Sequence, residues 1–128
     1  MKFFLIFSYS GDTRPCKELA VHGNGADLLI HEATFEDDLS KEAIDKNHST
    51  VSEAISIAQQ MGAKSVILTH FSQRYPKIPV LNNLEFPVAI AFDLMTVKLS
   101  LVSKLYSHWR HLQEIFSNPE EEDEEESK

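Results

Sequence analysis

Short apolar runs alternate with polar stretches from residue 3 to residue 69, and this alternation predicts a sheet with helical connections. Three of the runs are typical of buried strands: Phe3–Ser8, Ala26–His31 and Ser65–Thr69. The first run is mostly apolar, so we expect that strand to be buried on both faces. Between the first two runs, Cys16–Val21 predicts a helix that Pro15 opens and the turn Gly23-Asn24-Gly25 ends.

The best-defined helix of the sequence begins after Thr50. The segment from Thr50 to Glu53 fits a capping box, in which the threonine hydroxyl and the glutamate each satisfy a free amide of the first turn. Apolar residues then recur at helical spacing until Gly62, which ends the helix. Residues 35–47 are polar with weak helical spacing, so a short surface helix or an ordered loop is expected there.

The pattern after residue 70 is less regular. Residues 71–87 contain three prolines and predict a loop. Val88–Phe92 and Met95–Leu101 predict two further strands, with a hairpin expected across Asp93-Leu94. Together with the earlier elements, this order predicts an α/β fold with a mixed or parallel sheet.

An amphipathic helix and an acidic run close the sequence. The helix is marked by Leu105, Trp109, Leu112 and Phe116. Glu120–Glu126 contains seven acidic residues, so the net charge of −8 leaves about −1 for the rest of the chain. We therefore predict one partial domain at residues 1–117 and a disordered tail at residues 118–128. A near-neutral body does not bind nucleic acid by bulk charge, so any RNA contact would be local.

The cysteine count and the hydropathy argue against a fold held by internal disulfides and against a membrane-spanning protein. Cys16 is the single cysteine, so the chain forms no internal disulfide. No stretch approaches the roughly 20 apolar residues of a transmembrane helix, so no membrane partner is expected.

Polar residues with catalytic potential follow the predicted strands. Asp12 follows the first strand, His31 and Glu32 end the second, and His70 ends the third. The carboxyl ends of strands in an open α/β sheet form the edge where ligands bind. Each residue alone also has a structural explanation: Asp12 can cap a helix, and His70 can satisfy backbone groups at the strand end. His31 can belong to the core, support a neighbouring ligand or lie on the surface.

A second group of candidates surrounds the start of the helix after Thr50. Ser49 and Thr50 are expected to bind a phosphate through the free amides there, and Arg74 through its guanidinium. His48 precedes them and can protonate a leaving alkoxide. Alternatively, Ser49 and Thr50 only cap the helix, while His48 and Arg74 are solvated.

Taken in order, the motifs around these residues resemble one known family. They are Ser-Gly-Asp-Thr-Arg-Pro-Cys from position 10, Leu-Leu-Ile-His-Glu-Ala-Thr-Phe from 28, His-Ser-Thr from 48, Leu-Thr-His-Phe-Ser-Gln-Arg-Tyr from 68 and Ala-Phe-Asp from 91. Together they resemble the tRNase Z family of the metallo-β-lactamase superfamily. The resemblance implies an α/β fold that is the C-terminal half of an αββα sandwich, with one mixed sheet and flanking helices.

The resemblance also implies a role for each motif. Asp12 would bridge two zinc ions, and His70 would bind one of them. His48, supported by Glu32, would give a proton to the leaving 3′-oxygen when the 3′ trailer is cut from a tRNA precursor. A protein of this family is expected inside the cell, in the nucleus, the mitochondrion or the cytosol.

The sequence departs from the family in one motif. It contains no His-x-His-x-Asp-His, so we interpret the chain as the C-terminal portion of the catalytic domain, with that motif upstream of Met1. Asp12 and His70 are fewer than the three or four ligands of a typical zinc site, so the isolated chain is expected to be inactive. It would pair with an N-terminal half or with a second copy of itself. The alternative is a truncated, non-catalytic relative that acts as an interaction or regulatory module.

Overall fold

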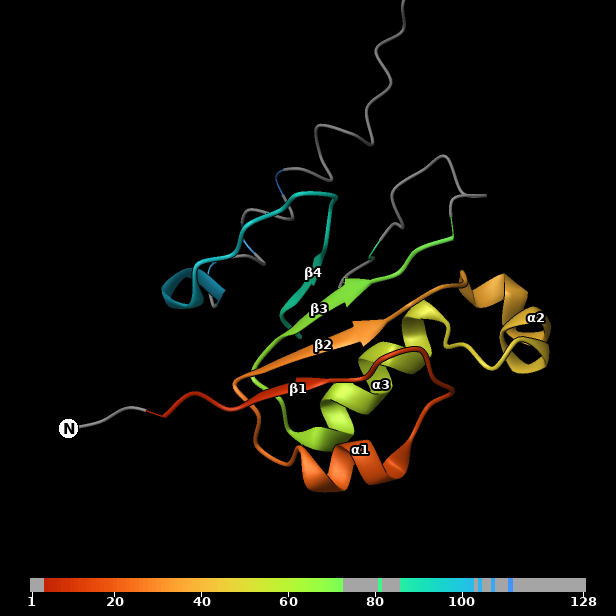
Figure 1. The fold of residues 1–128 in the computed structure, drawn as a ribbon, viewed down its shortest axis with the longest axis horizontal. Coiled ribbons are helices and arrows are strands. Elements are labelled where there is room, and N and C mark those ends of the chain that lie inside the picture. The colour runs from red at the N-terminus through yellow and green to blue at the C-terminus, as the bar shows by residue number, and fades with distance from the viewer. Residues whose placement is uncertain are drawn as a thin grey trace, which may run out of the picture.

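The computed structural model describes residues 4–72, 81, 86–102, 104, 107 and 111. These residues form a four-stranded parallel sheet in which the strands neighbour one another in chain order (Figure 1). The strands are β1 (Phe7–Tyr9), β2 (Leu28–Glu32), β3 (Val66–Thr69) and β4 (Val88–Ile90). The helices are α1 (Lys17–His22), α2 (Ser40–Asp45) and α3 (Val51–Met61), with 3₁₀ turns at Asp37–Leu39 and Leu99–Leu101.

Helices α1 and α3 cover one face of the sheet and pack against each other (Figure 1). Side chains alternate between the two faces of a strand, so Leu29 of β2 and Leu68 of β3 both point to this helix-covered face. Ile57 and Met61 of α3 pack into the same cluster and are almost completely buried. The helix-covered face is therefore the main hydrophobic core of the described residues.

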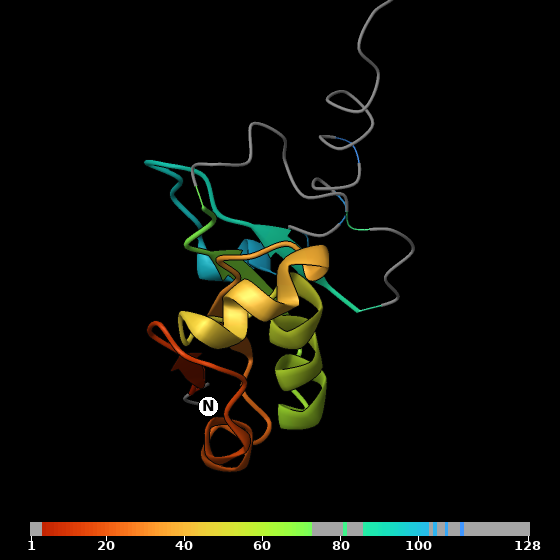
Figure 2. The same ribbon diagram turned by 90° about the vertical axis from the view of Figure 1, so that its right-hand side faces the viewer.

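The opposite face of the sheet is only partly covered. Leu28, Ile67 and Ala89 form a small buried cluster there. Val97 and Val102, from the segment after β4, pack against part of this cluster on the side away from the helices (Figure 2). A hollow of about 480 Å³ remains beside them. This face thus keeps an apolar surface that the described residues do not fill.

Most of the elements predicted from the sequence are confirmed. The α/β class and the first three strands are present, and residues 37–45 form the short helical segment expected there. Thr50 and Glu53 form the predicted capping box at the start of α3. Gly62 ends α3 with a left-handed φ of 63°, a conformation that glycine adopts without a steric penalty.

The predicted burial of the first strand is wrong. The strand starts at Phe7 rather than at Phe3, which lies outside the described residues, and it is an edge strand that pairs only with β2 among the strands described. Phe7 is 46% exposed and Tyr9 is 68% exposed. The apolar composition of this run predicts burial on both faces, but hydrophobicity alone does not distinguish a buried strand from an edge strand whose apolar side chains remain uncovered.

The predicted hairpin across Asp93-Leu94 is also wrong. A turn does form there, and Leu94 has a φ of 62°, but β4 ends at Ile90 and pairs in parallel with β3. The chain then crosses the open face, where Val97 finds an apolar contact, instead of returning beside β4. The described sheet is therefore parallel throughout rather than mixed.

Two predictions fall outside the described residues: the helix marked by Leu105, Trp109, Leu112 and Phe116, and the acidic tail at residues 118–128. Among the residues that are described, no helix has the length and hydropathy needed to cross a bilayer.

One carboxylate links the start of α3 to the loop after β1. Glu53 completes the capping box by accepting a hydrogen bond from the Thr50 amide at 2.9 Å. Its two oxygens also pair with the Arg14 guanidinium, which donates a further bond to the carbonyl of His48. Arg14 thereby holds the loop that carries Asp12 against the N-terminal end of α3.

Glu53→Gln should lower the free energy of unfolding at neutral pH and have a smaller effect at acidic pH. Burial alone would raise the pKa of Glu53, but the hydrogen bonds from Arg14 and Thr50 outweigh it and lower the pKa. The charged form therefore adds stability above the ordinary glutamate pKa, and this contribution disappears as the pH falls through the lowered folded-state value. Urea unfolding at pH 7 should show a loss of about 1 kcal/mol, which shrinks near pH 3.

Glu42→Gln, which removes the same charge from an exposed position on α2, is the matched control. Its effect should stay within about 0.5 kcal/mol at both pH values. A Glu53→Gln chain as stable as the unmodified chain at pH 7 would show that the link between Arg14 and α3 contributes nothing.

Candidate active site

The buried carboxylate of Glu32 is the centre of the site. Glu32 ends β2, is 1% exposed and accepts five hydrogen bonds. The donors are the amides of Thr13, Thr34 and Ser49 at 3.0 Å each, the Thr34 hydroxyl at 2.9 Å and Nδ1 of His48 at 2.9 Å. These donors lie after β1, after β2 and before α3, so a single side chain joins three loops at the same edge of the sheet.

The hydrogen bonds keep Glu32 charged despite its burial. Burial on its own would raise the pKa of Glu32, but the bonds from Thr34, Thr13 and His48 outweigh it and lower the pKa. An ionised carboxylate only accepts hydrogen bonds. Nδ1 of His48 must therefore carry a proton and donate it to Glu32, which leaves Nε2 of His48 as the free ring nitrogen.

His48 stands between the buried carboxylate and the surface. Its side chain is 21% exposed, and its ring stacks on that of His70 with the centroids 5.3 Å apart and the planes at 28°. The ring of Phe35 lies 6.1 Å from it, tilted by 57°. The His48 ring is thus held by its hydrogen bond to Glu32 and by contacts with the rings of His70 and Phe35.

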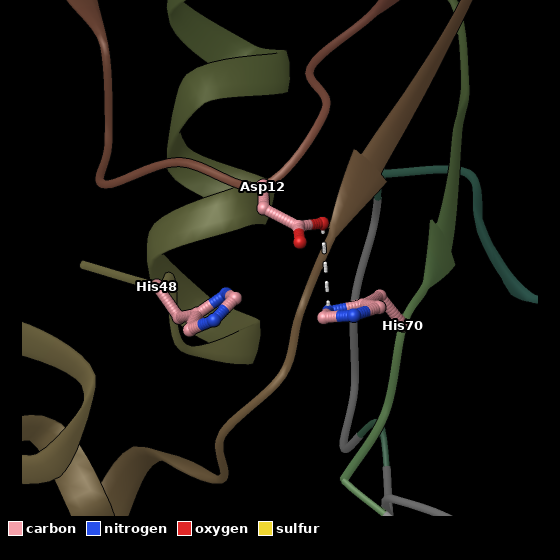
Figure 3. A group of neighbouring side chains, drawn as sticks. All are labelled: Asp12, His48 and His70. Carbon is pink, nitrogen blue, oxygen red and sulfur yellow. Dashed lines mark ion pairs between the residues drawn. The ribbon is translucent and has the colours of Figure 1, made fainter. Parts of the chain in front are cut away.

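The side chains of Asp12, His48 and His70 lie close together (Figure 3). Asp12 comes from the loop after β1 and His70 directly follows β3. One potential ligand atom from each of the three residues lies within 4.8 Å of the others, and Asp12 Oδ1 is 3.7 Å from His70 Nδ1. His70 adopts a left-handed φ of 64°, which is strained for a residue with a side chain and is common at functional sites.

The donor set fits a divalent transition metal such as zinc. A carboxylate and two imidazoles are ligands that zinc accepts, at about 2.0–2.2 Å from the metal. Two such atoms on one ion lie about 3–3.5 Å apart, so the side chains of the three residues, whose ligand atoms lie within 4.8 Å of one another, need only small movements to meet one ion. The set supplies at most three protein ligands from the described residues, which matches the protein ligands of one catalytic zinc site but not of two.

The residues predicted to bind phosphate have other partners. Ser49 is fully buried, its amide donates to Glu32, and its hydroxyl donates to the Thr13 carbonyl at 2.6 Å. The amide of Thr50 donates to Glu53, and the next two amides of α3 donate to Phe35 and to Asp37. The first turn of α3 therefore offers a phosphate no free donor among these groups. Arg74 lies outside the described residues.

His31 belongs to the core rather than to the cluster of Asp12, His48 and His70. It is fully buried, and its Nδ1 lies 2.6 Å from the carbonyl oxygen of Glu32. Burial lowers the pKa of His31, so the ring is neutral at neutral pH. Of the alternatives that the sequence left open for His31, the structure selects a core position.

Two residues of the site have contacts that the sequence does not predict. Thr34 belongs to the quoted His-Glu-Ala-Thr motif, yet only the structure places its hydroxyl among Glu32, His48 and His70. Arg14, in the first motif, pairs with Glu53. The sequence gave no signal of these contacts, because Thr34 and Arg14 meet partners that are at least fourteen positions away.

Comparisons with known proteins identify long relatives of this chain. The family described as Beta-lactamase superfamily domain matches residues 6–71. The mitochondrial tRNAse Z TRZ4 of Arabidopsis thaliana is 48% identical over 111 residues, which are 86% of this chain and 12% of the relative. Human zinc phosphodiesterase ELAC protein 2 is 53% identical over 90 residues, which are 70% of this chain and 11% of the relative.

The fold has a similar counterpart among solved structures. A long form RNase Z from yeast superimposes with a TM-score of 0.76 at 44% identity, covering 87% of this chain and 15% of that protein. The chain therefore spans only a small part of the relatives that it matches.

Glu32→Gln should destabilise the chain strongly. The amide NH₂ of glutamine would replace an oxygen that accepts either three or two hydrogen bonds, so buried donors would face another donor. Leaving such groups without acceptors should cost about 2–4 kcal/mol in the free energy of unfolding, measured with urea. Glu42→Gln is again the control at an exposed position. A loss below about 0.5 kcal/mol for Glu32→Gln would mean that the carboxylate does not join the three loops.

Proposed function

The chain belongs to the metallo-β-lactamase superfamily and, within it, to the tRNase Z family, and we propose that it forms the C-terminal part of a catalytic domain that removes the 3′ trailer from tRNA precursors. The observation that carries this proposal is the hydrogen bond between Glu32 and His48, next to the ligand pair Asp12 and His70. It combines an acid–base group with metal ligands at one edge of the sheet.

The proposed cofactor is zinc, held by Asp12 and His70 together with ligands from outside the described residues. Bound there, zinc would polarise the scissile phosphodiester and lower the pKa of a water molecule. Asp12 is 58% exposed and His70 49% exposed at their side chains, so both reach a ligand that approaches from solvent. Asp12 is also the residue proposed to contact two ions, because a carboxylate offers two oxygens as ligands.

His48 is the proposed proton donor. Because its Nδ1 is bonded to Glu32, the other ring nitrogen, Nε2, is available to hold a proton and release it to the leaving 3′-oxygen. The nearby carboxylate keeps the ring in one orientation, as an acid does for a catalytic histidine in other hydrolases. Glu32 is buried and has no free oxygen toward solvent, so its role is to position His48 rather than to contact RNA.

The proposed substrate is precursor tRNA, which the names of the tRNase Z relatives suggest. The same names support a mitochondrial location as a further proposal. The isolated chain supplies at most three ligands from its described residues, which favours a second reading. In that reading the chain is non-catalytic by itself and uses its uncovered apolar sheet face for interaction with a protein partner.

His48→Ala should separate cleavage from binding. We would make the change in a tRNase Z catalytic domain completed by joining this chain to the upstream part of a relative. Loss of the proton donor should slow single-turnover cleavage of a tRNA precursor about 100-fold or more, with zinc content and tRNA affinity nearly unchanged. Asp12→Ala in the same protein should lose both bound zinc and cleavage.

His22→Ala, at an exposed position on α1, is the control for replacing a histidine. It should leave cleavage, zinc content and tRNA affinity unchanged. Equal losses of cleavage and tRNA affinity in His48→Ala would make His48 a binding residue. Loss of zinc in His48→Ala would make it a third metal ligand.

A further inference from the structure

The hydroxyl of Thr34 contacts three side chains of the site, those of Glu32, His48 and His70. It lies 2.9 Å from Glu32 Oε2, 2.7 Å from His70 Nδ1 and 3.2 Å from His48 Nδ1. Thr34 is 9% exposed, and its own amide also donates to Glu32. This hydroxyl therefore connects the buried carboxylate to the proposed metal ligand, a link that the proposed reaction does not yet use.

Counting protons fixes the direction of these hydrogen bonds. A hydroxyl has one proton and two lone pairs. The ionised carboxylate of Glu32 has no proton, so a separation of 2.9 Å between the two oxygens is favourable only if Thr34 donates to Glu32. The single proton of the hydroxyl is then used, and Thr34 can only accept a bond from His70.

The direction of these hydrogen bonds determines which ring nitrogen of His70 carries the proton. At 2.7 Å from an oxygen that can only accept, Nδ1 of His70 must carry the ring proton. The lone pair of the neutral ring is then on Nε2. Since metals bind the nitrogen that carries a lone pair, the hydrogen bond made by the other nitrogen decides which atom is the ligand.

We propose that Thr34 is a positioning residue whose hydroxyl holds His70 in the tautomer protonated on Nδ1 and so presents Nε2 as its ligand atom. Glu32 then orients both histidines: His48 directly, and His70 through the Thr34 hydroxyl. The inference rests on the proposed function only in taking His70 as a metal ligand. The tautomer itself is a property of the metal-free chain.

The tautomer can be measured directly by NMR. In the ¹⁵N-labelled chain, free of metal and at about pH 8 where histidine is ordinarily neutral, long-range ¹H–¹⁵N correlations distinguish Nδ1–H from Nε2–H rings. The His70→Gln chain identifies the signals of His70 by their disappearance. We expect His70 to be mainly Nδ1–H, whereas a free histidine side chain prefers Nε2–H.

Three variants test the origin of this preference. Thr34→Val removes the hydroxyl at constant shape and should move the tautomer ratio of His70 about fivefold toward Nε2–H, the effect of one lost hydrogen bond. Thr34→Ser keeps the hydroxyl and should restore the original ratio. Thr69→Val, which makes the same chemical change in the residue before His70, should leave the ratio as it is.

Either of two results would overturn the proposal. One is a His70 ring that is mainly Nε2–H in the unmodified chain, which requires no variant and holds even if Thr34→Val does not fold. The other is a folded Thr34→Val chain whose ratio equals that of the unmodified chain. Neither result depends on RNA cleavage, so failure of this inference is distinct from failure of the proposed function.

Discussion

A charged carboxylate buried in a protein is stable only when its oxygens are fully supplied with donors, and in this chain that requirement shapes the whole edge of the sheet. Glu32 is held at the end of β2 by the sheet, and its five hydrogen bonds come from segments after β1, after β2 and before α3. The loop bearing Asp12 and the segment bearing His48 are both fixed in this way. The positions of Asp12 and His48 thus follow from the need to supply one buried charge, that of Glu32, with hydrogen-bond donors.

Much of this arrangement is predictable from the sequence. Apolar runs between turn residues indicate a parallel α/β sheet, and the carboxyl ends of its strands carry Asp12, Glu32 and His70. The capping box at Thr50 and Glu53 is predictable because both partners lie within one helical turn. Each of these features depends on neighbours close in sequence or on the shared direction of parallel strands.

The features that the sequence did not predict depend on packing between distant segments. Phe7 and Tyr9 are exposed because β1 lies at the edge of the described sheet, and an apolar run does not reveal which strand has neighbours on both sides. The segment after β4 crosses the open face because Val97 packs there, a contact that competes with strand pairing. The roles of Thr34 and Arg14 come from side chains that meet across loops.

The central claim is that Glu32 binds the amides of three separate loops, and amide hydrogen exchange tests it most directly. The amides of Thr13, Thr34 and Ser49 all donate to Glu32 rather than to a backbone carbonyl. If the carboxylate holds these loops, all three amides should exchange at least about 100-fold more slowly than in an unfolded peptide, although none belongs to a strand or helix. Exchange of all three at unfolded-peptide rates, in a chain whose β2 and β3 amides are protected, would contradict the account.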